Sequence, residues 1–332
     1  MSDRIGSEAE LIETYLAPLA YGLPGACNLI DDAAVLTVAD NEELVVTTDA
    51  VAAGVHFFED DPPDAIAWKA LAVNISDLVA KGATPLAYQM ALSFPEAPRH
   101  DWMAKFAEGL RNAQLAFAVT LSGGDTDRRP GPLSVTITAI GRVPASQTVR
   151  RSGGRPGDRL FVTNTLGDAA LGLELRRASS AVAGWALDEQ DRAFLLDRYL
   201  RPRPSIVAAA IVLEHASAAM DLSDGLAKDL GRLCRVGGTG ARVRIGDLPL
   251  SRAARLAMAR DPDVLERIVT GGDDYEVLAA VPPDRLARFA ADAEARGLAF
   301  TEIGILTADG GVEILDQSGR AREFSRPGWD HF

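Results

Sequence analysis

The stretch from about Asp64 to Lys81 most constrains how this chain can fold, because it predicts a helix that is apolar on nearly every side and ends at Gly82. At about 3.6 residues per turn, Asn74, Asp77 and Lys81 share one narrow polar face. Such a helix must be buried, and its polar face must find partners, because an unpaired buried carboxylate costs several kcal/mol. Those partners are either a structural Asp77–Lys81 pair at i,i+4 or a functional site.

Helices and strands are expected to alternate along the 332 residues, which predicts an α/β or α+β chain, and this length favours two domains over one. We expect a boundary near residue 145, shortly before the glycine-rich stretch 152–158, and therefore domains at 1–145 and 146–332. The expected strands are 32–38, 44–48, 86–94, 117–121, 133–143, 159–163, 241–245, 277–281 and two more near the C-terminus. The expected helices are 64–81, 100–115, 168–178, 188–200, 204–215, one after residue 225, 251–260 and 283–296.

The formal net charge of −13 argues against nucleic acid or an anionic membrane as a partner, since both require a basic surface. The two cysteines, Cys27 and Cys234, lie far apart and suggest neither a disulfide framework nor a zinc site, which fits a cytoplasmic protein. The N-terminal segment begins a capping-box helix at Ser7 rather than a signal peptide, and no apolar run reaches the roughly 18 residues of a membrane span.

Aspartates placed among small and hydroxyl-bearing residues recur along the chain. They occur at Asp31-Asp32, Thr47-Thr48-Asp49, Asp77, Gly124-Asp125, Asp221-Leu222-Ser223-Asp224 and Gly271-Gly272-Asp273-Asp274. Carboxylates gathered in one place repel one another unless a cation neutralises them, and ligands that are all oxygen favour Mg²⁺ over zinc. Each aspartate alone is more often a helix cap or a turn residue, but six such sites together favour a Mg²⁺–nucleotide site and phosphoryl transfer.

The common phosphate-binding loops are missing, since neither G-x-x-x-x-G-K-[ST] nor G-x-G-x-x-G occurs. Phosphate recognition must therefore rely on other groups. Ser122-Gly123-Gly124 can offer backbone amides, and Arg150-Arg151 can bring guanidinium groups to the domain junction.

An ordered set of segments runs along the chain: Asp31-Asp32-Ala33-Ala34, Thr47-Thr48-Asp49, Gly54-Val55-His56-Phe57, residues 69–77, Gly123-Gly124-Asp125-Thr126, Asp221-Leu222-Ser223-Asp224-Gly225, Gly271-Gly272-Asp273-Asp274-Tyr275-Glu276 and Gly328-Trp329-Asp330-His331-Phe332. This set resembles the thiamine-monophosphate kinase family, which belongs to the superfamily of aminoimidazole ribonucleotide synthetase. The resemblance covers nearly the whole chain. It implies a two-domain PurM-like fold, in which the N-terminal domain binds ATP and Mg²⁺ and pairs across a β-barrel in a homodimer, beside a C-terminal α/β domain.

The resemblance also implies a reaction that converts thiamine monophosphate and ATP into thiamine diphosphate and ADP, with several Mg²⁺ ions. By motif, Asp32, Thr47, Thr48, Asp49, Asp77, Asp125, Asp221 and Asp224 look like metal ligands. Gly123, Gly124, Arg151 and Ser223 look like ATP contacts, and His56, Asp273 and Trp329 look like contacts to the thiamine phosphate. No residue is assigned as a general base; Asp77 and Asp221 are expected to act through the metal, with Asp77 near the centre of the cluster.

The chain departs from the family pattern at two places. Asn28-Leu29-Ile30 stands where the family often has Gly-x-Gly, and Asp273 stands where it usually has glutamate. Two single residues also have plain structural explanations, because Trp329 could anchor the C-terminal segment and His56 could be a core histidine. The alternatives for the whole chain are another ATP-dependent enzyme of the superfamily, close to aminoimidazole ribonucleotide synthetase, or a non-catalytic Mg²⁺–nucleotide binding protein.

Because the acceptor phosphate is already anionic near neutral pH, its second pKa being about 6, no strong general base is required. We therefore expect direct in-line transfer without a phosphoenzyme, with positioning and charge neutralisation as the main contributions of the protein.

Overall fold

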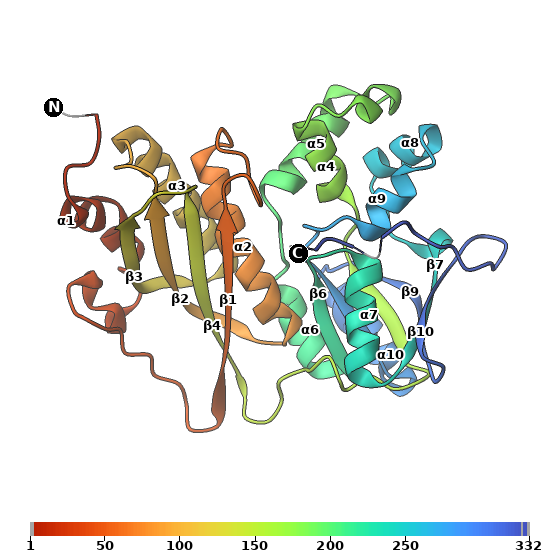
Figure 1. The fold of residues 1–332 in the computed structure, drawn as a ribbon. Coiled ribbons are helices and arrows are strands. Elements are labelled where there is room, and N and C mark those ends of the chain that lie inside the picture. Colours follow the sequence, from red (N-terminus) through yellow and green to blue (C-terminus); the bar gives the residue numbers. More distant parts are fainter. Residues whose placement is uncertain (1–2, 327, 331–332) are drawn as a thin grey trace. The chain divides into compact units, whose positions relative to one another are not determined.

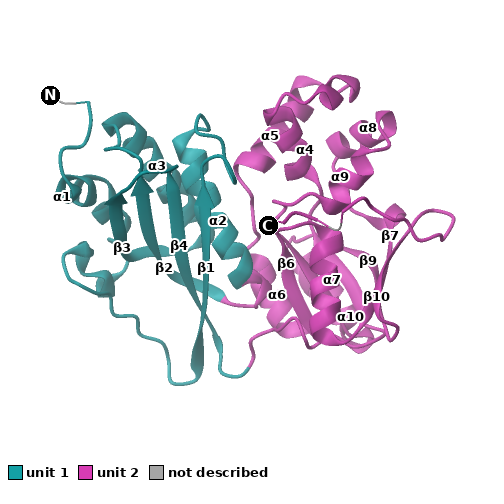
Figure 2. Ribbon diagram, viewed as in Figure 1, with its two compact units in different colours: residues 1–78, 84–146 teal, residues 79–83, 147–332 magenta. Residues whose placement is uncertain are grey.

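The computed structural model describes residues 3–326 and 328–330. The chain forms two compact units: unit 1 contains residues 1–78 and 84–146, and unit 2 contains residues 79–83 and 147–332 (Figures 1 and 2). The helix predicted from the apolar stretch is confirmed as α2, Pro63–Ala80. Its last two residues belong to unit 2, so this single helix contributes to both units.

Unit 1 contains a four-stranded sheet in the order β1-β4-β2-β3. Its strands are β1 (Glu42–Ala52), β2 (Thr84–Phe94), β3 (Thr120–Arg128) and β4 (Ser134–Pro144), and its long helices are α2 and α3 (His100–Phe117). β4 pairs antiparallel with β1 and β2, and β2 pairs parallel with β3. The short α1 (Glu8–Leu11) and a series of tight turns precede β1.

The sheet of unit 1 has one covered face and one open face. Figure 1 shows α2 and α3 on one face of the sheet. Along β4, Val135, Ile137 and Ala139 are buried, whereas the residues between them are half-buried. On the edge strand β1, Leu44 and Val46 point to the open side and are 44% and 58% exposed. This alternation is what a half-buried sheet requires, because successive side chains of a strand point to opposite faces.

Unit 2 contains a six-stranded mixed sheet in the order β10-β7-β9-β5-β8-β6. Its strands are β5 (Arg159–Thr163), β6 (Ala218–Leu222), β7 (Gly240–Arg244), β8 (Glu276–Val281), β9 (Phe300–Thr307) and β10 (Gly311–Leu315). Its helices are α4 (Asp168–Arg176), α5 (Glu189–Leu200), α6 (Val207–His215), α7 (Leu226–Gly237), α8 (Arg252–Arg260), α9 (Val264–Thr270) and α10 (Leu286–Ala295).

Two apolar clusters form the core of unit 2. The smaller one joins Ile211 of α6 and Phe289 of α10 to Phe161 and Val281 of the sheet. The larger one collects the apolar residues of α4, α7, α8 and α9 around β5, β6 and β7. Every residue of β8 is buried, as expected for a strand with strands on both sides and helices packed over the sheet.

Two expected strands are wrong. Residues 33–39 form no regular structure, because the backbone turns back on itself there and Val35 N donates to Gly25 O rather than to a strand. The strand expected at 117–121 is displaced, because α3 continues to Phe117 and ends at Ala118 in the left-handed conformation (φ 52°). β3 then includes the Gly123-Gly124 pair, which the sequence had suggested as a turn.

Two elements were not predicted. The strand β6 was missed because its alanine-rich sequence lacks the β-branched residues that favour a strand, and the short helix α9 was missed between two turn signals. Among the described residues, no helix combines the length and the apolar character that crossing a membrane requires.

Tyr88 of β2 provides a test of packing in unit 1. The residue is completely buried, burial raises the pKa of its phenol, and its hydroxyl has no hydrogen-bond partner among the described residues. A buried hydroxyl without a partner costs about 1–3 kcal/mol, so Tyr88→Phe is expected to raise the free energy of unfolding by about 1 kcal/mol.

Urea unfolding measures this change, with Tyr21→Phe as the control, because Tyr21 is 68% exposed and its substitution should change stability by less than about 0.5 kcal/mol. A loss of stability in Tyr88→Phe would contradict the prediction.

Candidate active site

The polar face of α2 meets the edge strand β1. The Asn74 side chain accepts a hydrogen bond from Asp49 N (2.9 Å) and donates one to Ala70 O (3.1 Å). The Thr47 hydroxyl donates to the Asp77 carboxylate (2.6 Å). The buried polar face predicted from the sequence is therefore satisfied, and its partners include two of the predicted metal-ligating residues of β1.

The pleat of β1 divides the predicted Thr47-Thr48-Asp49 group. Thr47 and Asp49 stand opposite the buried residues Ala139 and Ile137 of β4, on the α2 side of the sheet. Thr48 points to the open face, where its hydroxyl is 2.9 Å from that of Thr138. The sequence suggested that this group ends a strand, but it lies inside β1, so its members reach different faces.

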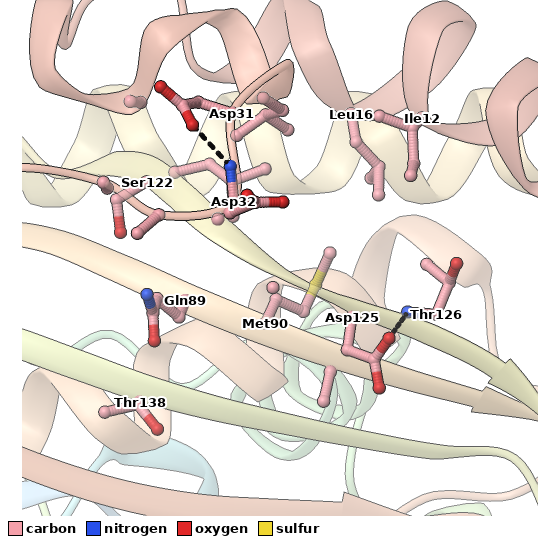
Figure 3. Close-up of a pocket in the computed structure, with 18 of the residues that line it drawn as sticks. Ile12, Leu16, Asp31, Asp32, Gln89, Met90, Ser122, Asp125, Thr126 and Thr138 are labelled. Atoms are coloured by element: carbon pink, nitrogen blue, oxygen red, sulfur yellow. Dashed lines mark hydrogen bonds between the residues drawn. The ribbon is translucent and has the colours of Figure 1, made fainter.

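A pocket of about 400 Å³ lies in unit 1, lined by β2, β3, β4 and the segment before β1 (Figure 3). Its lining includes four predicted site residues: Asp32, Gly123, Gly124 and Asp125. Asp32 N donates to the Asp31 carboxylate (2.8 Å), and Thr126 N donates to the Asp125 carboxylate (2.9 Å). The structure thus brings the predicted ATP-binding glycines and two predicted metal ligands to one cavity.

Gly124 also has a structural requirement. A Cβ atom at this position would lie 1.9 Å from Met90 O of the paired strand β2, so no other residue fits without moving the strands. A Cβ at Gly123 would lie 3.7 Å from Gln89 Nε2, an ordinary contact distance. The role of either glycine as an ATP contact stays a prediction.

The loop before Asp31 is strained. Cys27, Asn28 and Leu29 have positive φ angles of 50°, 53° and 60°, a conformation that costs a non-glycine residue roughly 1–2 kcal/mol. None of the three is glycine, the residue that adopts this conformation most readily.

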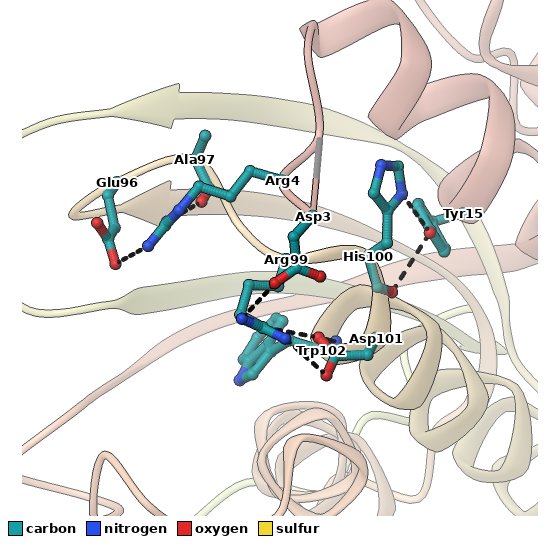
Figure 4. Close-up of polar contacts among 9 residues, drawn as sticks. All are labelled: Asp3, Arg4, Tyr15, Glu96, Ala97, Arg99, His100, Asp101 and Trp102. Atoms are coloured by element: carbon teal, nitrogen blue, oxygen red, sulfur yellow. Dashed lines mark hydrogen bonds and ion pairs between the residues drawn. The ribbon is translucent and has the colours of Figure 1, made fainter. Parts of the chain in front are cut away.

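The segment that closes the pocket is tied to the loop between β2 and α3 (Figure 4). Ile5 N donates to Pro98 O (3.0 Å), and the Arg4 guanidinium pairs with Glu96 (2.7 Å). Farther along, the Tyr15 hydroxyl lies 2.9 Å from His100 Nδ1. These contacts hold the segment from Arg4 to Tyr15 beside that loop, and Glu8, Ile12 and Leu16 of this part of the chain line the pocket.

In unit 2, three segments that are far apart in sequence meet at the end of β6. Asp273 N donates to Ser223 O (2.9 Å), and Tyr275 N donates to Leu222 O (2.8 Å). Trp329 N donates to Asp224 O (3.0 Å). The predicted residues Asp221, Ser223, Asp224, Asp273 and Trp329 are therefore gathered, whereas His331 and Phe332 of the terminal motif lie outside the described residues.

Asp229 of α7 is a residue that the sequence did not reveal. It is completely buried, and its carboxylate accepts from both Ser223 N (3.0 Å) and Asp224 N (2.8 Å). Burial raises the pKa of Asp229 to about 6. The only sequence signal was an aspartate in the first turn of a helix, which is common at any helix start.

The side chain of Asp224 is held by two cations of α7. Arg232 lies 2.6 Å from its carboxylate and Lys228 lies 3.4 Å from it. The Asp273 carboxylate accepts a hydrogen bond from the Tyr275 hydroxyl (3.2 Å). The predicted metal ligand Asp224 and the predicted substrate contact Asp273 thus already have polar partners within unit 2.

Other contacts define the positions of His56 and Arg151. His56 Nδ1 accepts from Ala52 N (3.1 Å), and its carbonyl accepts from Lys69 Nζ (3.0 Å), so the histidine shapes the turn after β1. The carbonyl of Arg150, the residue before Arg151, accepts from Ala219 N near the start of β6. Ser223 comes directly after the opposite end of β6.

The predicted metal ligands suit Mg²⁺ in chemistry, because all their donors are oxygens and such an ion takes one or two carboxylates and completes its shell with water and phosphate. Among the histidines, cysteines, aspartates and glutamates of the described residues, only Glu214, His215 and Asp292 place three possible ligand atoms within 4.8 Å of one another. His215 Nε2 is 2.6 Å from Asp292 Oδ2, which is a hydrogen bond. Two ligands of one tetrahedral zinc ion lie about 3.4 Å apart, so this group is a helix-to-helix contact.

Three further carboxylates are buried beside the Gly271–Glu276 segment. Gly167 N donates to Asp274, Thr163 and Asn164 donate to Glu276, and the Thr165 and Ser251 hydroxyls donate to Asp168. Burial raises the pKa of all three carboxyl groups, that of Glu276 to about 7. These three carboxyl groups form a buried polar cluster in which their protonated forms are favoured.

Comparison with known proteins gives the family. Residues 30–143 match the domain family "AIR synthase related protein, N-terminal domain", and residues 155–317 match "AIR synthase related protein, C-terminal domain". Thiamine-monophosphate kinase of Caulobacter vibrioides is 38% identical over 98% of this chain and 91% of its own length. The chain belongs to the thiamine-monophosphate kinase family. The Escherichia coli enzyme of that name is 38% identical over 91% of this chain and 90% of its own length.

Solved structures agree. A crystal structure of thiamine-monophosphate kinase from Stenotrophomonas maltophilia superposes with a TM-score of 0.80 at 38% identity, covering 89% of this chain and 91% of the other. AaThiL complexed with AMPPCP and TMP superposes with a TM-score of 0.76 at 30% identity, covering 91% of each chain. The hydrogenase maturation protein HypE in complex with ATP, 19% identical with a TM-score of 0.77 over 98% of this chain and 96% of its own, shares the fold. The predicted two-domain PurM-like α/β fold is confirmed.

The buried carboxyl groups predict a pH dependence of stability in this thiamine-monophosphate kinase family member. The pKa of Glu276 is raised from 4.5 to about 7 in the folded protein, so the folded state binds a proton that the unfolded chain releases. Its stabilising contribution is therefore complete below about pH 4.5 and is lost as pH rises through about 7, by up to about 3 kcal/mol.

Glu276→Gln should flatten this decline between about pH 5 and pH 8 in urea unfolding, whereas the exposed control Glu313→Gln should leave it unchanged. The same slope in Glu276→Gln and in the unchanged protein would refute the assignment.

Proposed function

We propose that this protein phosphorylates thiamine monophosphate with ATP to give thiamine diphosphate and ADP. The observation that carries the proposal is the meeting of Asp221–Asp224, Gly271–Tyr275 and Trp329 at one end of β6, in a chain related over nearly its full length to proteins of that activity. A related structure binds both AMPPCP and TMP, which supports the two substrates.

In this proposal the protein's residues position the two substrates and neutralise the charge of their phosphates, and they do not exchange protons with them. The acceptor phosphate oxygen is already anionic near neutral pH, so transfer needs no general base. Backbone amides at Ser122 and Gly123 would face the nucleotide phosphates, and Trp329 would stack on the thiamine rings. Asp229 would hold Ser223 and Asp224 in place through their backbone amides.

Each unit contributes carboxylates that we propose as magnesium ligands. Asp32 and Asp125 line the pocket of unit 1, and Asp77 lies beside Thr47. In unit 2 the proposed ligands are Asp221 and Asp224. When bound, the ions would neutralise charge on the phosphates during in-line transfer.

Replacing Asp77 tests this assignment. Asp77→Asn keeps the size of the side chain and an acceptor for the Thr47 hydroxyl, so the fold should persist while turnover falls by about 10²-fold or more. The assay follows thiamine diphosphate formed from MgATP and thiamine monophosphate, with unfolding curves recorded in parallel.

Asp40→Asn, in the exposed turn before β1, is the matched control and should keep full activity. A folded and fully active Asp77→Asn would return this residue to a purely structural role. Nucleotide binding without turnover in the unchanged protein would favour a binding protein over an enzyme.

We also propose that a second copy of the chain covers the open face of the unit 1 sheet. Leu44 and Val46 of β1 are exposed side by side on that face, beside the half-buried Ile140 of β4. Burying such apolar surface stabilises an interface by about 25 cal/mol per Å².

Val46→Lys should therefore convert a dimer into a monomer, whereas Val236→Lys, an equally exposed valine on α7, should not. Light scattering measures the mass of each variant. A monomer already in the unchanged protein would exclude the proposed dimer.

A further inference from the structure

The C-terminal segment is held at two places on unit 2. Phe324 packs against the larger apolar cluster, and Ser325 N donates to the Glu266 carboxylate of α9 (2.9 Å). Farther on, Trp329 N donates to Asp224 O (3.0 Å). The C-terminal segment is therefore attached first to α9 and then to the loop that follows β6.

Lys228 stabilises the attachment of the C-terminal segment at Trp329. It stands in the first turn of α7, and its ammonium group donates to the carbonyl oxygen of Trp329. It also lies 3.4 Å from the Asp224 carboxylate and 3.5 Å from that of Asp330. A lysine has three N–H donors, and here three acceptors surround them. The side chain is only 15% exposed, so these contacts are partly shielded from water.

Gly328 lets the segment come this close. A Cβ atom there would lie 2.6 Å from Asp224 O and 2.6 Å from Lys228 Cβ. Any other residue would therefore push the segment away from α7. The charge of Lys228 on α7 and the absence of a side chain at Gly328 therefore both support the contact between the C-terminal segment and α7.

The consequence concerns Trp329. Its backbone is fixed at both its N–H and its carbonyl, while its side chain remains 37% exposed. A ring whose backbone is already fixed loses little conformational entropy when a ligand stacks on it. The geometry suits an aromatic surface for a flat cationic ring.

We infer that Lys228 is a positioning residue of the substrate site, which holds the C-terminal segment on the Asp221–Asp224 loop and so fixes Trp329 as a stacking surface for the thiamine rings. The inference rests on the proposed function for the identity of the ligand. The attachment itself does not depend on that function.

Kinetics of single and double variants test the role. Lys228→Met keeps the aliphatic stem and removes the charge, and Gly328→Ala displaces the segment by a different means. Each should raise the KM for thiamine monophosphate by about tenfold, as Trp329→Ala does, and leave the KM for ATP within about twofold. Lys228→Arg should restore most of the affinity, and the exposed control Lys105→Met on α3 should behave as the unchanged protein.

Combination with Trp329→Ala separates positioning from direct contact. If Lys228 acts through Trp329, the double variant Lys228→Met/Trp329→Ala should be no worse than Trp329→Ala alone. Effects that multiply, an equal rise in the KM for ATP, or a changed Mg²⁺ concentration for half-maximal rate would overturn the inference and assign Lys228 to a phosphate or to the metal site.

Hydrogen exchange tests the attachment without activity. The amide of Trp329 should exchange faster in Lys228→Met and in Gly328→Ala than in the unchanged protein or in Lys105→Met, because its bond to Asp224 O is loosened. Unchanged exchange in both variants would refute the attachment. Faster exchange, together with no thiamine diphosphate formation by the unchanged protein, would refute the proposed function instead.

Discussion

The hydrogen bonds between α2 and β1 are the contacts on which the arrangement of unit 1 depends. β1 is an edge strand, so β4 can satisfy only one of its two sides. The buried amide of Asn74 takes the N–H of Asp49, at a point where a further strand would otherwise be needed. The helix therefore satisfies a backbone N–H at the edge of the sheet. In doing so it fixes Thr47, Asp49 and Asp77 beside one another on rigid elements rather than on a loop.

The sequence could predict this helix because several signals agreed. Its apolar surface, its start at Pro63 and its end before Gly82 all specified the same element, and the narrow polar face required buried partners. β5 was likewise predicted to the residue, because its apolar run is short and bounded by turn residues. Agreement between local signals of different kinds is what made these predictions correct.

Other features could not be predicted because one residue type serves several purposes. A glycine pair usually indicates a turn, yet Gly124 lies within β3. A glycine is needed at this position because Met90 O of the next strand leaves no space for a Cβ atom. Three residues with positive φ precede Asp31 although none is glycine. Asp229 and Lys228 look like ordinary charges at the start of a helix, and only the fold shows that both contact the loop preceding that helix. Such contacts depend on tertiary structure, which no local pattern contains.

The way each carboxylate is neutralised distinguishes the parts of the candidate site. Asp224 is paired with Arg232 and Lys228, and Asp168, Asp274 and Glu276 combine hydrogen bonds with raised pKa values. Among the described residues, the ion pairs include neither Asp32 nor Asp125, which are exposed at the unit 1 pocket, and the Asp125 carboxylate accepts only the backbone N–H of Thr126 among the hydrogen bonds described. A cation gains most where the protein has provided least compensation, since it need not displace a positive side chain. We therefore expect magnesium to bind more readily at Asp32 and Asp125 than at Asp224, whose carboxylate is already neutralised by Arg232 and Lys228.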